Sequence, residues 1–234
     1  MEGKKIITKL ENNRPVRLEN IKEDLTIISY LIKADEVMNA MGYTEHGLRH
    51  ANLTSHIAKN ILQHLKYTQR DVELAAIAAY MHDIGNCVAR TNHSQSGAIL
   101  TYNLLTRLSM DPEEIASIIS AIGNHEEYEG GHPISPIGAT VILADKTDVH
   151  RTRVTNPEMK NFDIHDRVNY AAMYSFLRVN PEERILKLEL TIDTEFASVM
   201  EYFEIFLDRM LVCRKAARLL KCEFSLEINK SKLL

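Results

Sequence analysis

Cysteine is scarce in this sequence. Only Cys87, Cys213 and Cys222 occur among the 234 residues, and no C-x-x-C pair is present. An odd number of scattered cysteines indicates neither a disulfide framework nor a thiolate zinc site. We therefore expect a reducing, cytoplasmic compartment.

Long apolar runs are also missing. The longest, such as LAAIAAYM at residues 74–81, are far shorter than the roughly 18 residues that a membrane span requires. The N-terminal stretch MEGKKIITKLENN carries charges but lacks the apolar segment of an export signal. We expect neither export nor a membrane partner.

A strong basic field is absent as well. The chain has 28 basic and 32 acidic residues, which gives a formal net charge of -4. Proteins that bind nucleic-acid polymers usually carry a net basic field, so we do not expect such a partner. A local basic patch is still sufficient to bind a single phosphate group.

Most of the chain has the pattern of a helical bundle. Apolar residues recur at helical spacing over about residues 20–150, with breaks at Gly42, after Gly85 and at residues 127–133. Hydrophobic residues make up 45% and charged residues 26%, which is typical of a globular domain. We predict a mainly α protein in which residues 1–183 form a helical bundle with an N-terminal extension.

The C-terminal part shows a different period. Apolar and polar residues alternate over residues 186–192 and 222–228, as in half-buried strands. The apolar helical stretch between them, residues 196–211, predicts core or a subunit interface. We predict a small α/β appendage, strand-helix-strand, over residues 184–234 and outside the catalytic bundle. Two strands alone are marginal, so a third must come from IITKL near the N-terminus or from a second subunit, which would make a homodimer.

Histidine and aspartate side chains fall on the apolar faces of the predicted helices. His50 shares a face with Thr54 and Ile57, which should be buried. The segment ELAAIAAYMHDIG is apolar around nearly its whole circumference before it reaches His82 and Asp83. A buried carboxylate without compensation is very costly, so Asp83 must be paired or must bind a metal.

Two further helices repeat this arrangement. His125 extends the apolar face of Ile122, and Asp145 extends the face of Val141. Nitrogen and oxygen donors from four helices thus converge. Such donors suit a divalent ion of iron, manganese, zinc, cobalt or magnesium. A buried hydrogen-bond network without a metal is the alternative.

These residues lie in motifs that resemble the H…HD…D signature of the HD superfamily of phosphohydrolases. The motifs are H-A-N-L-T from His50, H-D-I-G from His82 and A-D-K-T-D from Ala144, and the resemblance spans roughly residues 25–155. It implies a helical HD-domain bundle with the metal ligands His50, His82, Asp83 and Asp145.

Two more histidines, His93 and His125, lie between the HD pair and the last aspartate, as in family members with two metals. The stretch NHSQSGAIL around His93 resembles the H-P-x-x-G-A-x-I-L segment of those members. The resemblance therefore implies two ions, iron or manganese, bridged by Asp83. One ion would take His50, His82 and Asp145, and the other would take His93 and His125.

The stretch NHEEYEGGHP, residues 124–133, resembles part of the HD-GYP cyclic-dinucleotide phosphodiesterases. Asn86, Asn124 and His132 depart from the pattern of that family, so we do not expect specificity for cyclic di-GMP. The short spacing from the HD pair to His93 is more similar to that in bacterial HD enzymes that hydrolyse dinucleoside polyphosphates. We therefore expect a small phosphorylated substrate, a nucleotide.

Other residues near the motifs are candidates for catalysis and binding. Our catalytic candidates are Asp83, Asp148 and Glu126, because the last two could orient a ligand or transfer a proton. Our candidates for binding phosphate are Lys146, Arg151 and Arg153, with a solvated helix end as the alternative. A second dipeptide, His165-Asp166, has no apolar helix before it, and we interpret it as the start of a surface helix.

The leading hypothesis is an enzyme that hydrolyses a phosphate ester or anhydride of a small nucleotide substrate by metal-bound hydroxide. A di-iron oxygenase of the same fold and a non-catalytic HD-like signalling or interaction module are the alternatives. An absorbance spectrum and oxygen consumption would separate the oxygenase from the hydrolase. The complete ligand set counts against the non-catalytic module.

Overall fold

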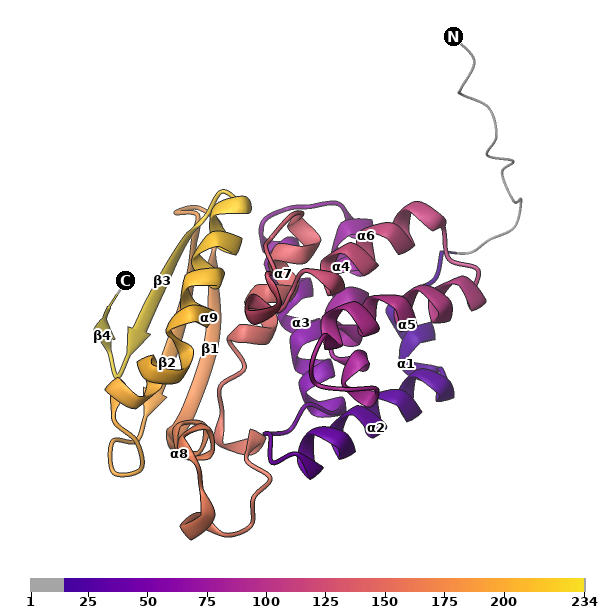
Figure 1. Ribbon diagram of the computed structural model, residues 1–234. Helices are drawn as coiled ribbons and strands as arrows, with labels where there is room; N and C mark the ends of the chain where they lie inside the picture. The colour runs from indigo at the N-terminus through magenta and orange to yellow at the C-terminus, as the bar shows by residue number, and fades with distance from the viewer. Residues whose placement is uncertain (1–14, 234) are drawn as a thin grey trace.

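The computed structural model describes residues 15–233 and contains a helical bundle beside a small sheet (Figure 1). The bundle is formed by α1 (Leu18–Glu23), α2 (Leu25–Ala40), α3 (Leu48–His64), α4 (Gln69–Met81), α5 (His93–Arg107), α6 (Pro112–Gly123) and α7 (Pro136–Lys146). Short 3-10 turns are η1 (Ile84–Cys87), η2 (Glu127–Glu129), η3 (Arg151–Arg153) and η4 (Met159–Asn161). The C-terminal part contains α8 (Ile164–Ala171), β1 (Ala172–Asn180), β2 (Ile185–Ile192), α9 (Val199–Leu219), β3 (Glu223–Ile228) and β4 (Ser231–Lys232). The predicted fold class is confirmed.

Helix α4 lies at the centre of the bundle because it is apolar on nearly all sides. Its residues 74–81 are all buried, and it packs against α3, α6 and α7. Thr68 caps its N-terminus by accepting a hydrogen bond from the Asp71 N–H. Burying a leucine or isoleucine side chain contributes about 1.5–3 kcal/mol. This packing holds His82 and Asp83, which follow the helix, in the interior.

Helices α6 and α7 each begin with a cap followed by proline. Asp111 caps α6 and Ser135 caps α7, in both cases by accepting hydrogen bonds from backbone N–H groups. A proline at the first helical position is favourable there, because that position has no intrahelical N–H bond to lose. These starts place His125 just after α6 and Asp145 in the last turn of α7.

The strand order in the sheet is β1-β2-β3-β4. Strand β1 runs antiparallel to β2, β3 runs parallel to β2, and β4 runs antiparallel to β3. Helix α9 makes the crossover between β2 and β3 and packs on the sheet. On β2, Leu186, Leu188 and Leu190 are buried, whereas Lys187 and Glu189 are only half-buried, as the period of two predicts.

The third strand that the sheet requires is β1, Ala172–Asn180, which precedes β2 in the chain. No second subunit is needed to supply it, and the IITKL segment lies outside the described residues. The periodicity missed β1 because it is an edge strand without clear alternation. Met173, Tyr174 and Phe176 are all exposed. The sheet therefore begins at Ala172, whereas the prediction placed the start of the C-terminal unit at residue 184.

Helix α9 contacts both parts of the chain. Tyr202, Phe206 and Met210 are buried, and the helix packs against α7 and η2 as well as β3. The apolar stripe predicted there is core between the sheet and the bundle. The C-terminal unit is thus packed against the helix that carries Asp145. Over residues 15–233, no helix combines the length and the apolar character that crossing a membrane requires.

We expect Gly85→Ala to destabilise the protein strongly. A Cβ atom at this position would lie far inside van der Waals contact with the His93 carbonyl oxygen and 2.5 Å from the Gly97 nitrogen, and neither backbone atom can move aside easily. Overpacking of this kind typically costs about 1–3 kcal/mol, which would lower the urea midpoint of unfolding. Gly123→Ala is the matched control, because its Cβ would meet nothing closer than 3.7 Å. Equal losses of stability in the two variants would contradict this account.

Candidate metal centre

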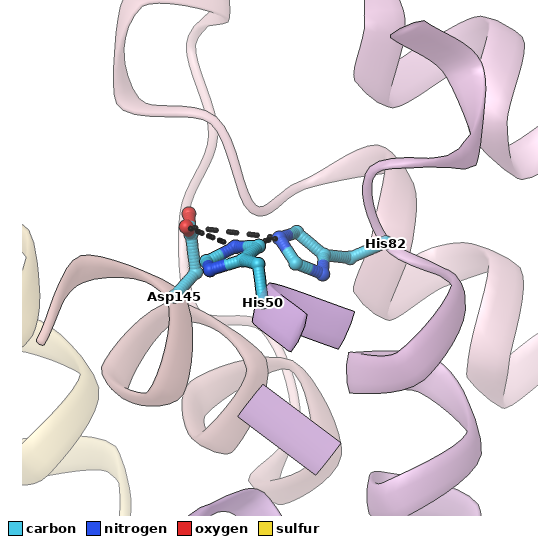
Figure 2. Close-up of side chains that lie close together, drawn as sticks. All are labelled: His50, His82 and Asp145. Carbon is cyan, nitrogen blue, oxygen red and sulfur yellow. Dashed lines mark hydrogen bonds and ion pairs between the residues drawn. The ribbon is translucent and has the colours of Figure 1, made fainter. Parts of the chain in front are cut away.

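Three helices bring the first cluster of donor atoms together, which consists of His50, His82 and Asp145. His50 lies on α3, His82 follows α4 and Asp145 lies on α7, and all three side chains are buried (Figure 2). His50 Nε2 lies 3.3 Å from His82 Nε2 and 3.4 Å from Asp145 Oδ1. His82 Nε2 lies 3.6 Å from the same oxygen. The three donor atoms therefore surround one small volume.

A second cluster, formed by His93, His125 and Glu126, lies beside the first. His93 is the first residue of α5, and the other two follow α6. His93 Nε2 lies 3.2 Å from His125 Nε2 and 3.6 Å from Glu126 Oε2, and all three residues are buried. The two clusters adjoin, because the ring centroids of His82 and His125 are 4.9 Å apart.

Asp83 lies between the clusters and faces both. Its Oδ2 lies 3.6 Å from His50 Nε2 and 3.4 Å from His82 Nε2, whereas its Oδ1 lies 3.4 Å from His93 Nε2. The carboxylate is buried, and Oδ2 has no hydrogen-bond partner among residues 15–233. The two oxygens are thus directed at different clusters, as a bridging ligand requires.

The outer ring nitrogen of every histidine in the two clusters faces an oxygen atom. The Nδ1 atoms of His82, His93 and His125 lie 2.8, 3.1 and 2.7 Å from the carbonyl oxygens of Ala79, Arg90 and Ile122, and His50 Nδ1 lies 2.7 Å from Asp148 Oδ2. These contacts keep a proton on each Nδ1 atom. Each ring therefore points its Nε2 atom into the clusters, where the lone pair of that atom can bind a metal.

The second cluster has the properties of a cation site. Burial lowers the pKa of His93 and lowers that of His125 to about 3, so both rings are neutral. Two neutral Nε2 atoms 3.2 Å apart direct lone pairs at each other, which is unfavourable without a cation. The Arg90 guanidinium lies 3.2 Å from both His93 Nε2 and Glu126 Oε2. The second cluster thus already attracts the positive charge of Arg90, and its donor atoms fit a divalent ion.

The first cluster is dominated by its carboxylates. Burial raises the pKa values of Asp83 and Asp145, but the surrounding histidines and Lys146 outweigh it and hold both well below the usual range. Burial alone would lower the pKa of His82, yet the two carboxylates raise it to about 9. In the absence of an ion, a proton on His82 compensates the negative charge. A divalent ion would take the place of that proton.

The spacing of the donor atoms suits a transition-metal ion. Ligand atoms that lie about 2.0–2.2 Å from one ion are about 3–3.5 Å from each other. The nitrogen and oxygen atoms of the first cluster are 3.3–3.6 Å apart, and in the second cluster His93 Nε2 lies 3.2 and 3.6 Å from the donor atoms of His125 and Glu126. The structure thus gathers all six sequence-predicted ligands and adds Glu126 as a further donor.

Comparison with known proteins identifies the family. Residues 43–149 match the family model described as HD domain. This part of the chain is an HD domain. The match indicates metal-dependent phosphohydrolase-type chemistry at the level of the superfamily. The uncharacterized protein MJ1020 of Methanocaldococcus jannaschii is similar as well, with 24% identity over 205 residues that span 76% of this chain and 76% of the relative.

Asp148 contacts His50, one of the predicted metal ligands. Its Oδ2 accepts hydrogen bonds from His50 Nδ1 and from Arg49 Nη2, each at 2.7 Å, and the carboxylate is buried. Burial raises its pKa, but Arg153, His50 and Arg49 outweigh this effect and hold the pKa far below the usual range. Asn86 contacts the carboxylate between the two clusters in a similar way, since its Nδ2 donates to Asp83 Oδ1 at 2.9 Å.

The three residues predicted to bind phosphate lie in different surroundings. Lys146 is buried and pairs with Asp145 at 2.9 Å and with Glu127 at 2.6 Å, so its charge is compensated within the HD domain. Burial lowers its pKa, but these carboxylates outweigh that effect and raise it. Arg151 stacks on an aromatic ring. Arg153 borders the cavity described next, but its guanidinium donates to backbone carbonyl groups.

A cavity of about 680 Å³ opens beside the second cluster, with Glu126 in its lining. Its other lining residues include Tyr43, His46, Arg90, Tyr128, Phe206 and Arg209. The sequence analysis did not select either Arg90 or Arg209. Arg90 lies in the loop before α5, and Arg209 lies on α9 in the C-terminal unit. The second H-D dipeptide begins helix α8, as predicted. Its His165 also borders the cavity, which the sequence analysis did not predict.

We expect Asp83→Ala to lose metal from both clusters. This residue is the only one of the described ligands whose two oxygens face both clusters, so its removal weakens both. Elemental analysis after gel filtration measures the effect. Asp166→Ala, in the other H-D dipeptide, is the matched control and should retain the wild-type metal content. Full occupancy in Asp83→Ala would refute the bridging role.

We expect metal binding to release a proton at neutral pH. The pKa of His82 is about 9 without an ion, so the ring is protonated at pH 7 and must lose that proton before Nε2 can bind a metal. Metal affinity should therefore rise about tenfold per pH unit up to about pH 9 and then level off. Calorimetric titration with Mn²⁺ in buffers of different ionisation enthalpy counts the protons. A heat of binding independent of the buffer would contradict the expectation.

Proposed function

We propose that this protein is a two-metal phosphohydrolase that acts on a small, nucleotide-sized phosphate ester or anhydride. The observation that carries the proposal is the position of Asp83. Its Oδ2 faces His50 and His82, while its Oδ1 faces His93. A carboxylate shared in this way suits two ions about 3.5–4 Å apart, the arrangement used by many enzymes that cleave phosphate groups.

Two divalent ions, iron or manganese, would polarise a phosphoryl oxygen and lower the pKa of bound water from about 15.7 toward about 7. Asp83 and Asp145 supply two of the negative charges around them, so the loaded centre stays positive and attracts an anion. Asp148 and Asn86 keep His50 and Asp83 in position by hydrogen bonds, which reduces the reorganisation needed when substrate binds.

Glu126 has the properties of a group that orients an attacking water. Burial raises its pKa, but Lys146, His125 and Arg90 outweigh this and lower it to about 2, so the carboxylate stays ionised. Its Oε1 has no hydrogen-bond partner within residues 15–233, and the residue borders the cavity. A free carboxylate oxygen beside the second cluster can accept a hydrogen bond from a water molecule. This contact can direct the lone pair of the water at phosphorus.

The cavity supports a substrate of nucleotide size. Its volume of about 680 Å³ lies inside the range of roughly 300–1,000 Å³ typical of small-molecule sites. Tyr43 and Tyr128 offer exposed aromatic surface, on which a base could stack. Arg90 lies at the side of the second cluster and can bind a phosphate oxygen through its guanidinium.

The metal count tests the two-ion centre. Wild-type protein prepared with excess Mn²⁺ should bind two ions, and His93→Ala and His125→Ala should each lower the number toward one, because they remove donors of the second cluster only. His56→Ala, an exposed histidine of α3, is the control. Circular dichroism shows whether each variant is folded. A single ion in the wild-type protein would overturn the two-metal mechanism.

The reaction itself is tested with a panel of nucleoside phosphates, dinucleoside polyphosphates and bis(p-nitrophenyl) phosphate. We expect metal-dependent hydrolysis, measured as nucleotide product or p-nitrophenol, that falls at least about 100-fold in His93→Ala and His125→Ala. The iron-loaded protein should consume no oxygen with the same substrates. Oxygen consumption together with an absence of hydrolysis would favour the oxygenase alternative instead.

A further inference from the structure

Helix α9 carries an arginine from the C-terminal unit into the lining of the cavity. Arg209 borders this cavity together with Phe206, whose ring lies 4.8 Å from the guanidinium carbon. Stacking on the ring restricts the guanidinium to one orientation. We propose that Arg209 binds a second phosphate group of the substrate, next to the one held at the metal centre. This inference rests on the proposed phosphohydrolase function and names the class of substrate, a phosphoanhydride or polyphosphate.

The charge of Arg209 is only weakly compensated in the protein. Its nearest carboxylate oxygen is Glu127 Oε1, 3.6 Å from Nε, which is too long for a hydrogen bond. Nε is buried and has no hydrogen-bond partner among the residues that the structure describes. A buried N–H group without an acceptor is costly, and the rest of this guanidinium, in a side chain that is 20% exposed, has further donors for a ligand. The residue is therefore positioned as if for an acceptor that binds from the cavity.

The neighbouring carboxylate is already engaged elsewhere. Glu127 Oε2 lies 2.6 Å from Lys146 Nζ, and Lys146 Nζ lies 2.9 Å from Asp145 Oδ2. This row of charges connects the metal centre with α9. It also places Glu127 and Lys146 between Arg209 and Asp145 of the first cluster, so Arg209 suits a phosphate next to the one held at the ions. An adjacent phosphate on the same substrate can reach the cavity side of the row.

A second unpartnered group lies in the same lining. Asn169 of α8 is 4% exposed, and its Oδ1 has no hydrogen-bond partner in the described part of the chain. Its Nδ2 donates to the His165 carbonyl, which fixes the amide, and both residues border the cavity. A buried acceptor without a protein donor can accept a hydrogen bond from a hydroxyl or amine of the substrate. The C-terminal unit thus presents a cation and an acceptor to one ligand.

The metal centre adds to this need for an anion. The cavity lining has three cations, Arg90, Arg153 and Arg209, and three carboxylates, Glu126, Glu129 and Asp163, so these charges are matched. Two divalent ions would bring a charge of about +4, of which Asp83 and Asp145 compensate about half. A monophosphate compensates less of this excess than a diphosphate does. The electrostatics of the cavity therefore favour a substrate with at least two linked phosphate groups.

Binding of imidodiphosphate and of inorganic phosphate to the manganese-loaded protein tests the inference, because imidodiphosphate has the two linked phosphates but resists hydrolysis. Calorimetry should give tighter binding of imidodiphosphate to the wild-type protein. In Arg209→Gln, which keeps much of the side-chain length, that affinity should fall about 10- to 100-fold, while phosphate affinity and metal content stay unchanged. Arg209→Lys should recover part of the loss, because the charge returns without the planar pair of donors.

Arg218→Gln, an exposed arginine of the same helix, is the matched control and should bind both anions like the wild-type protein. Equal wild-type affinity for the two anions, or an unchanged imidodiphosphate affinity in Arg209→Gln, would overturn the inference. A parallel loss for both anions would do the same, because Arg209 would then act on the centre as a whole. These failures leave the proposed function standing if the wild-type protein binds two ions and hydrolyses phosphate bonds, whereas absence of metal would reject the proposed function itself.

Discussion

The buried carboxylate of Asp83 is the constraint on which the rest of the structure depends. An unpaired ion in a protein interior costs several kcal/mol. The chain must therefore surround this carboxylate with groups that can bind a compensating positive charge. The imidazoles provide this compensation when they bind a proton or a metal ion. Two of them are held in place by the same kind of contact at Nδ1. His82 and His125 each contact the carbonyl oxygen three residues earlier, in the last turn of the preceding helix. Carbonyl groups at that place have no intrahelical partner, so the helix ends themselves orient the ligands.

Much of the fold and of the candidate centre was predictable, because the signals are local. His50 and Asp145 lie on apolar helix faces, and the segment before His82 is apolar on all sides, so inward orientation follows from periodicity alone. The role of Lys146 was not predictable in the same way. It sits next to a ligand, as a phosphate-binding residue would, but Glu127 turns toward it from another loop and compensates its charge. Periodicity contains no information about such tertiary pairing.

Arg209 shows the same limit at longer range. The sequence pattern predicts the helix and its apolar stripe, but it cannot orient α9 relative to the bundle, so it cannot reveal which residue reaches the cavity. Strand β1 was missed for a different reason, because an exposed edge strand carries little alternation. Both gaps concern the C-terminal unit. The lining of the cavity therefore depends on a contact, α9 against α7 and η2, that only the three-dimensional arrangement makes visible.

The position of α9 has a consequence for the order of assembly. All the donor atoms of the two clusters lie between His50 and Asp145, whereas the cavity lining from α8 and α9 comes later in the chain. The sheet that supports α9 needs the parallel pairing of β2 with β3, a contact between distant segments that forms slowly. The metal donors can thus come together while the cavity is still open on one side. By the same argument, local unfolding of the C-terminal unit would remove the α8 and α9 wall of the cavity, while all the donor atoms belong to the part of the chain that stays folded.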